Sequence, residues 1–119
     1  MIYLWLDAYC LSKKGAVRDY KMEWEAIRYM VGGKMFVMQG SDNKGRSIIT
    51  VKLEPVFGEF LRDRYPDITP GYYMNKMHWN SLDLNGTVPD DVVKDMLDKS
   101  YELVLKSLSK QQQNAILAG

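Results

Sequence analysis

The polar and aromatic side chains between residues 70 and 80 are the part of this chain best equipped for chemistry. His78 is the only histidine among 119 residues, and it lies next to Trp79 and two residues after Lys76. An imidazole can act as a general base, whereas a cation among aromatic rings is typical of surfaces that stack on nucleic-acid bases. The stretch therefore predicts a small catalytic site or a recognition surface. An amphipathic strand with polar tips would have the same composition.

A catalytic role for His78 requires a carboxylate that orients its ring. Asp83 follows it closely in sequence, but their odd spacing places the two side chains on opposite faces of a strand. The simpler interpretation is a structural histidine whose nitrogens bond the backbone or Asn75. We therefore expect no enzymatic activity, and catalysis centred on His78 is only a third hypothesis.

The sequence also lacks the residue sets that metal and cofactor sites need. One histidine and one cysteine exclude the usual zinc ligand sets, and no calcium-type Asp-x-Asp-x-Asp-Gly loop is present. Gly32-Gly33-Lys34 joins two expected strands rather than opening a helix, so it does not predict a phosphate loop. Cys10 lies on an apolar helical stripe and is expected to be buried. We predict neither a metal nor a cofactor.

Nucleic-acid binding is the other chemistry that the residues allow. The side chains that would form such a surface, on two turns, are Lys44, Arg46, Tyr73, Asn75, Lys76, His78 and Trp79. The net charge is only +1, but residues 1–53 carry nine Lys and Arg against five Asp and Glu, whereas residues 54–119 carry seven against ten. This asymmetry allows a modest basic face. Dispersed, solvated charges explain the same pattern.

Length and composition predict one globular domain. The chain is 46% hydrophobic and 26% charged, and its single cysteine suits a reducing compartment. The apolar N-terminus lacks the basic region of a signal peptide, and no apolar run is long enough to span a membrane. We expect a cytoplasmic domain over residues 1–108, monomeric or weakly dimeric, followed by a flexible tail over residues 109–119.

Three helices are expected from the spacing of apolar residues. The spacing predicts them over residues 2–12, 54–65 and 89–108. The apolar face of the second helix is expected to consist of Val56, Phe57, Phe60 and Leu61. The stripe of the third is expected to consist of Val93, Leu97, Tyr101, Val104 and Leu108.

The strands are expected to form a largely antiparallel sheet. Residues 27–31 and 34–39 form a hairpin closed by Gly32-Gly33, residues 40–46 form a polar turn, and residues 47–53 form a third strand. Residues 16–24 are ambiguous and could form a short edge strand. Residues 72–74 and 78–84 suit two later strands or one interrupted strand. The prediction is a two-layer α+β fold: helix, three strands, helix, two strands, helix.

Several short motifs, in this order and spacing, resemble the MmcQ/YjbR family over residues 2–108. They are Val31-Gly32-Gly33-Lys34-Met35-Phe36, Tyr65-Pro66, Pro70-Gly71-Tyr72, Asn75-Lys76, His78-Trp79-Asn80, Val88-Pro89-Asp90 and Ser100-Tyr101. The resemblance implies a small α/β domain similar to secretion chaperones and CyaY-like proteins. It also implies DNA binding through a double-wing arrangement, without established catalytic residues.

By position, the two wings would correspond to residues 40–46 and 73–80. Met77 stands where the family usually has a basic residue, and Lys21-Met22 stand where it tends to have a Pro-Phe pair. From the resemblance, the first functional hypothesis is DNA binding through the two wings. The alternative is a chaperone-like module that binds a partner protein through the exposed sheet face or an edge strand.

Overall fold

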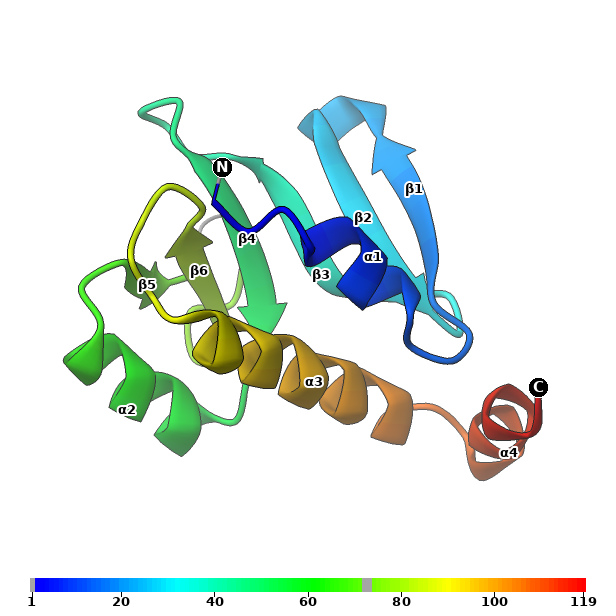
Figure 1. Cartoon of the computed structure of the whole chain (residues 1–119). Coiled ribbons are helices and arrows are strands. Elements are labelled where there is room, and N and C mark those ends of the chain that lie inside the picture. Colours follow the sequence, from blue (N-terminus) through cyan, green and yellow to red (C-terminus); the bar gives the residue numbers. More distant parts are fainter. Residues whose placement is uncertain (1, 72–73) are drawn as a thin grey trace.

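An antiparallel sheet forms the centre of the molecule and confirms the predicted α+β class. The computed structural model describes residues 2–71 and 74–119. Within these residues six strands pair in the order β1-β2-β3-β4-β6-β5 (Figure 1). The strands are β1 (Val17–Lys21), β2 (Ala26–Val31), β3 (Lys34–Ser41), β4 (Ser47–Lys52), β5 (Ile68–Pro70) and β6 (Trp79–Asp83).

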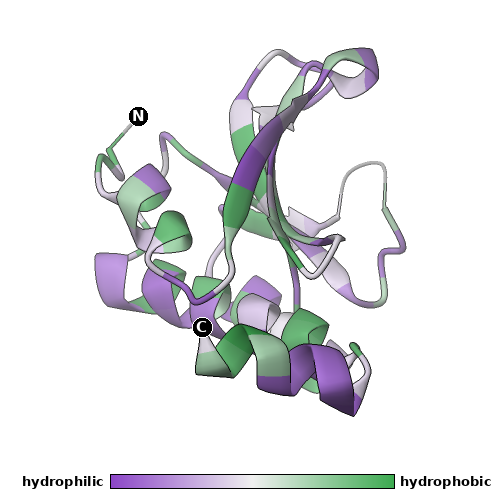
Figure 2. Ribbon diagram, turned by 90° about the vertical axis from the view of Figure 1, so that its right-hand side faces the viewer, coloured by the Kyte–Doolittle hydropathy of each residue, from purple (hydrophilic) through white to green (hydrophobic). Residues whose placement is uncertain are grey.

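Four α-helices and one short 3-10 turn of the described chain accompany this sheet. They are α1 (Leu6–Leu11), the short 3-10 turn η1 (Met22–Trp24), α2 (Pro55–Arg64), α3 (Asp90–Lys106) and α4 (Lys110–Ala118). Helix α3 packs on β2, β3 and β4, while α2 lies against β5. Figure 2 views the sheet edge-on, with α1 and α3 on one side and the connection between β5 and β6 on the other. We call the side without α1 and α3 the open face.

The predicted Gly-Gly hairpin is present and is fixed to α3. Gly32 and Gly33 have φ angles of 57° and 80°, the left-handed conformation that a tight two-residue turn requires. A Cβ atom on Gly32 would lie 2.4 Å from Leu108 Cδ1. The first glycine is therefore required by both its backbone angle and its packing.

Ser100 and Tyr101 of α3 both contact a β-bulge in β3. The register between β2 and β3 shifts at Tyr29 and Met30, so Phe36 is an extra residue in β3. Ser100 Oγ donates to Phe36 O at 2.6 Å and accepts from Lys52 N at 2.8 Å. The Tyr101 ring packs edge-on against Phe36, with 5.4 Å between centroids. Helix α3 thus satisfies backbone groups close to the bulge.

The core lies between the sheet and α1 and α3, and the predicted stripe of α3 is confirmed. Its five members are all buried: Val93, Leu97, Tyr101, Val104 and Leu108. The buried Cys10 also belongs to this core, as expected.

Two predictions about the helices were wrong. The first helix starts at Leu6 rather than residue 2, because Tyr3 is buried before it and its hydroxyl donates to Val88 O at 2.8 Å. On α2, only Leu61 of the four expected apolar residues is fully buried; Val56 and Phe60 are 82% and 54% exposed. Their spacing is helical, but no element of the described chain covers that face.

The later strands and the C-terminal segment also differ from the predictions. The strand that pairs with β6 is Ile68–Pro70 rather than residues 72–74. Residues 72 and 73 lie outside the described part of the chain, and Met74 lies in a bend. Residues 110–118 form α4 rather than an unstructured tail, and a capping box between Ser109 and Gln112 begins it. No helix of the described chain is long and apolar enough to cross a membrane.

Candidate binding surface

The open face carries a row of side chains that runs across all six strands. Directly paired residues of antiparallel strands point to the same side of a sheet. The register places Asp19, Arg28, Met38, Thr50, Ser81 and Thr69 in one row. Thr50 Oγ1 and Ser81 Oγ are buried and share a hydrogen bond of 2.9 Å. The centre of the open face is therefore shielded from solvent, although no helix of the described residues lies over it.

The connection between β5 and β6 lies on this face, as Figure 2 shows. Gly71 N donates to Trp79 O at 2.6 Å, and Trp79 N donates to Asn75 O at 2.9 Å. A Cβ atom on Gly71 would lie 2.7 Å from Trp79 O, so only glycine fits there. Asn75 Oδ1 accepts from Met77 N at 2.8 Å and closes the turn. This pairing shapes the predicted second wing.

Asp42 organises the first predicted wing, the turn between β3 and β4. Its Oδ1 accepts from Lys44 N at 2.9 Å and from Arg46 N at 3.0 Å, and its Oδ2 accepts from Arg46 Nε at 2.7 Å. Desolvation opposes ionisation of Asp42, but these hydrogen bonds outweigh it and lower the pKa of the carboxyl group. Arg46 is therefore paired with a carboxylate, while the Lys44 side chain is exposed.

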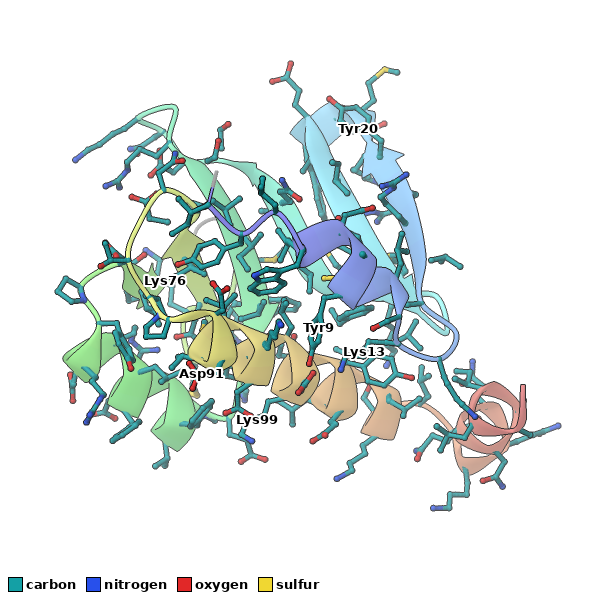
Figure 3. The ribbon with its side chains drawn as sticks, viewed as in Figure 1. Tyr9, Lys13, Tyr20, Lys76, Asp91 and Lys99 are labelled. Atoms are coloured by element: carbon teal, nitrogen blue, oxygen red, sulfur yellow. The ribbon has the colours of Figure 1, made fainter. Side chains whose placement is uncertain are left out.

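The second wing contributes one clearly exposed cation. Lys76 is exposed and lies at the β5–β6 side of the sheet, across the molecule from Tyr20 on β1 (Figure 3). Asn75 is exposed as well, and Tyr73 lies outside the described residues. The structure therefore gives each predicted wing one exposed lysine with no partner among the described residues.

His78 and Trp79 are half-buried rather than fully exposed. The backbone oxygen of His78 accepts from Leu53 N at 2.7 Å and from Asn80 Nδ2 at 3.2 Å. Within the described chain, no carboxylate is bonded to the imidazole, and Asn75 bonds Met77 instead. The contacts of His78 thus tie β6 to the end of β4 through its backbone.

A cavity of about 580 Å³ opens on the open face between η1 and the two predicted wings. Its floor is hollow because Ala26 and Gly40 have almost no side chain; a Cβ atom on Gly40 would lie 3.3 Å from Ala26 Cβ. The lining residues are Met22, Glu23, Trp24, Glu25, Ala26, Met38, Gly40, Ser41, Asp42 and Met74. Asp42 comes from one wing and Met74 from the other, so both wings border the same cavity.

The charges around this cavity are mostly paired. Lys21 lies 3.6 Å from Glu23, Arg28 lies 2.5 Å from Asp19, and Arg46 lies 2.7 Å from Asp42. Glu25 is exposed, and no described residue pairs with its carboxylate. A smaller cavity of about 140 Å³ next to the first wing is bordered by Asp42 and Arg46 and by two further carboxylates, Asp67 and Asp83. The open face therefore has no net basic character around its cavities.

The other reactive groups of the chain are poorly placed for chemistry. Burial, together with the nearby Asp7 carboxylate, raises the pKa of the Cys10 thiol to about 12. No group of three His, Cys, Asp or Glu side chains that could hold a metal ion occurs among the described residues. Tyr9 and Lys13 both contact Asp98 across the α1–α3 interface (Figure 3). These contacts join α3 to α1 and to the segment that follows α1.

Comparison with known proteins identifies the family. The family model described as YjbR matches residues 11–103. The chain belongs to the YjbR family. It is 28% identical to the uncharacterized protein YjbR of Escherichia coli K12 over 109 residues, which cover 92% of each chain. It is 32% identical to the uncharacterized protein YbdF of E. coli O157:H7 over 91 residues, covering 76% of this chain and 74% of that one.

Solved structures share the YjbR fold. The crystal structure of Deinococcus radiodurans protein DR2400, a DUF419 domain, superposes with a TM-score of 0.83 at 28% identity, covering 93% of this chain and 84% of that one. A Pseudomonas syringae protein superposes with a TM-score of 0.75 at 21% identity, covering 87% of this chain and 99% of that one. The second likeness supports the fold alone.

Several residues of the motifs shared with the YjbR family have structural roles in this chain. Gly32 packs on Leu108, Ser100 bonds backbone groups near the bulge, and Asn80 accepts from Arg62 of α2 while buried. The cavity residues of η1 and β3 were not predicted as a site. One signal was available, because a glycine inside a central strand often marks a place where another group approaches closely.

Proposed function

We propose that this YjbR-family chain is a non-catalytic binding module and that it binds a partner protein at the cavity of the open face. The observation that carries the proposal is the lining of the cavity, where Met22 is 77% exposed and Trp24 is 48% exposed. Methionine and tryptophan are typical of protein interfaces, and flexible methionine side chains adapt to partners of different shape. A volume of about 580 Å³ is enough to hold large side chains of a partner.

The absence of catalysis is part of the proposal and rests on two observations. Cys10 is fully buried with a raised pKa, which disfavours the reactive thiolate. Within the described chain, the His78 ring has no carboxylate that would orient it as a general base. A normal cellular phenotype of His78→Ala would agree with this part of the proposal, whereas a phenotype equal to gene deletion would contradict it.

The partner can be tested by photo-crosslinking in cells. A photoreactive benzophenone amino acid in place of Met22 should give a discrete protein adduct, because this side chain borders the cavity and points into solvent. The same amino acid in place of Glu59, an exposed residue of α2 outside the cavity, is the matched control. An adduct that forms equally from both positions, or that survives closure of the cavity by Ala26→Leu, would contradict the proposal.

DNA binding is the second candidate, and one observation favours it. Both predicted wings border the same cavity, and each carries an exposed lysine, Lys44 and Lys76. Phosphate contacts through two lysines would be weak and strongly salt-dependent because they release counterions. The pairing of Arg46 with Asp42 and the carboxylates near both wings make this candidate weaker than a protein partner.

Anisotropy with short labelled duplex and single-stranded DNA tests this candidate. Micromolar binding that weakens with added salt, and weakens further in Lys76→Ala, would support the wings as the interface. Lys110→Ala, an exposed lysine on α4, is the control and should bind as the unaltered protein does. No binding at low salt, where non-specific affinity is greatest, would remove DNA as a ligand of the isolated chain.

A further inference from the structure

The lining of the cavity of the open face includes groups that can contact a long, flexible side chain of a partner. Its floor is formed at Ala26 and Gly40, and its walls include the thioether side chains of Met22, Met38 and Met74. These walls would contact methylene groups along the whole length of a side chain.

Charge distinguishes which long side chain fits. Three ion pairs lie beside the cavity, Lys21–Glu23, Arg28–Asp19 and Arg46–Asp42, and the Glu25 carboxylate at its border has no ion-pair partner among the described residues. Lys21 Nζ lies 5.5 Å and the Arg28 guanidinium 5.9 Å from the centroid of the Trp24 ring, and each of these cations is already paired with a carboxylate. A ligand with one positive charge is complementary to this border, whereas a phosphate or a carboxylate is repelled.

We propose that the cavity takes a single lysine or arginine side chain from the partner protein. The methylene stem lies between the methionines and Trp24, and the cationic end reaches Glu25 at the rim, as long basic side chains do when they cover apolar surface with the charge in water. This inference rests on the proposed protein partner and adds the chemistry by which the partner is recognised.

Nuclear magnetic resonance with short peptides tests the inference without the natural partner. The probes are three acetylated and amidated pentapeptides, Ser-Thr-Xaa-Thr-Ser, in which Xaa is lysine, norleucine or glutamate. We expect the lysine peptide to shift the Trp24 indole signal and the amides of Ala26 and Gly40, with a Kd on the order of 1 mM. The norleucine peptide, which keeps the stem without the charge, should bind several-fold more weakly, and the glutamate peptide should not bind.

Variants of one residue separate charge from fold. Glu25→Gln should raise the Kd of the lysine peptide by about two- to fivefold, which is the effect of losing a single exposed ion pair. Glu25→Gly should raise this Kd equally while keeping the fold, because Glu25 has a φ angle of 50° that glycine adopts without strain. Glu59→Gln, which removes a carboxylate outside the cavity, should leave binding unchanged.

Two results would overturn the inference: norleucine binding as tightly as lysine, or Glu25→Gln binding as tightly as Glu59→Gln. Failure of this inference differs from failure of the proposed function. If the Met22 photo-adduct forms equally in Glu25→Gln and in the unaltered background, the partner protein stands and its basic anchor is wrong. If the lysine peptide binds but no specific adduct forms, the cavity recognises cations and the partner protein is wrong.

Discussion

At the scale of single residues, several motif side chains have a structural role because they form hydrogen bonds with backbone groups. Asn80 is buried in β6, accepts from Arg62 and donates to the backbone oxygen of His78. Ser100 Oγ bonds two backbone groups of different strands. Such residues are selected by the fold, so their presence in a motif does not by itself indicate a binding or catalytic role.

The two glycines of the β2–β3 turn provide a matched pair for separating strain from packing. Both have positive φ angles, but a Cβ atom would meet Leu108 at Gly32 and nothing within 4 Å at Gly33. We expect Gly33→Ala to lower the free energy of unfolding by about 1 kcal/mol and Gly32→Ala by about 2–4 kcal/mol. Urea denaturation measures both. Equal losses would show that Leu108 moves aside without cost.

Ser100→Ala tests the bond between α3 and the bulge. The change leaves Phe36 O and Lys52 N, close to the bulge, without their partner, and an unsatisfied buried group costs about 1–3 kcal/mol. We expect a fall of about 2–4 kcal/mol in the free energy of unfolding. Ser47→Ala, at an exposed position of β4, should change it by less than about 0.5 kcal/mol. A Ser100→Ala variant as stable as Ser47→Ala would mean that water replaces the hydroxyl.

At the scale of elements, polar contacts join α1 to the sheet beside its apolar face. Asp7 of α1 accepts from Tyr29 of β2 at 2.8 Å and from Arg18 of β1 at 2.6 Å. The sequence predicted a helix here, but the predicted helix began too early, at residue 2, because residues 2–5 continue the apolar pattern. Tyr3 is instead buried, and its hydroxyl bonds Val88 O. This contact joins segments far apart in the sequence, so the pattern of neighbouring residues could not show it.

The link through Asp7 should be visible in the pH dependence of stability. The hydrogen bonds from Tyr29 and Arg18 lower the pKa of Asp7 below its ordinary value of 3.8. The unfolded chain therefore binds this proton more readily, so the contribution to stability is present above pH 3.8 and is lost as pH falls through the folded pKa.

We expect Asp7→Asn to have a lower Tm than the unaltered protein near neutral pH. Most of this difference in Tm should disappear as the pH falls below 3.8 and through the folded pKa of Asp7. Thermal unfolding followed by circular dichroism at a series of pH values measures it. Glu59→Gln is the control, since its carboxylate is exposed and should give no pH-dependent difference. A constant difference at all pH values would show that the charge of Asp7 does not contribute.

At the scale of the whole molecule, elements were predictable but the site was not. The Gly-Gly turn, the central strands and the α3 stripe follow from patterns of neighbouring residues. The cavity joins η1, β3, the Asp42 turn and Met74, which meet only after the sheet has formed. Exposure of Val56 and Phe60 was missed for the same reason, because a helical pattern shows which residues share a face and not whether anything covers it.

Filling the cavity should leave the fold intact. Ala26 is one of the residues that line the cavity of about 580 Å³, and its own side chain is 2% exposed. We expect Ala26→Leu to change the free energy of unfolding by less than about 1 kcal/mol, because the added atoms enter an existing space. Urea denaturation measures the change, with Val37→Ala in the packed core as a comparison that should lose about 2 kcal/mol. A loss as large for Ala26→Leu would show that its side chain cannot reach the cavity.

The hollow at Ala26 and Gly40 has a consequence for how relatives with this fold diverge. The backbone contacts of both positions within the sheet do not depend on their side chains. A Cβ atom on Gly40 would lie 3.3 Å from Ala26 Cβ, so the sizes of the two side chains are coupled. An open and a closed binding face can therefore belong to chains that superpose closely. Ligand preference among such proteins should follow the volume of two side chains more closely than overall sequence identity, which makes these positions a practical criterion for grouping them.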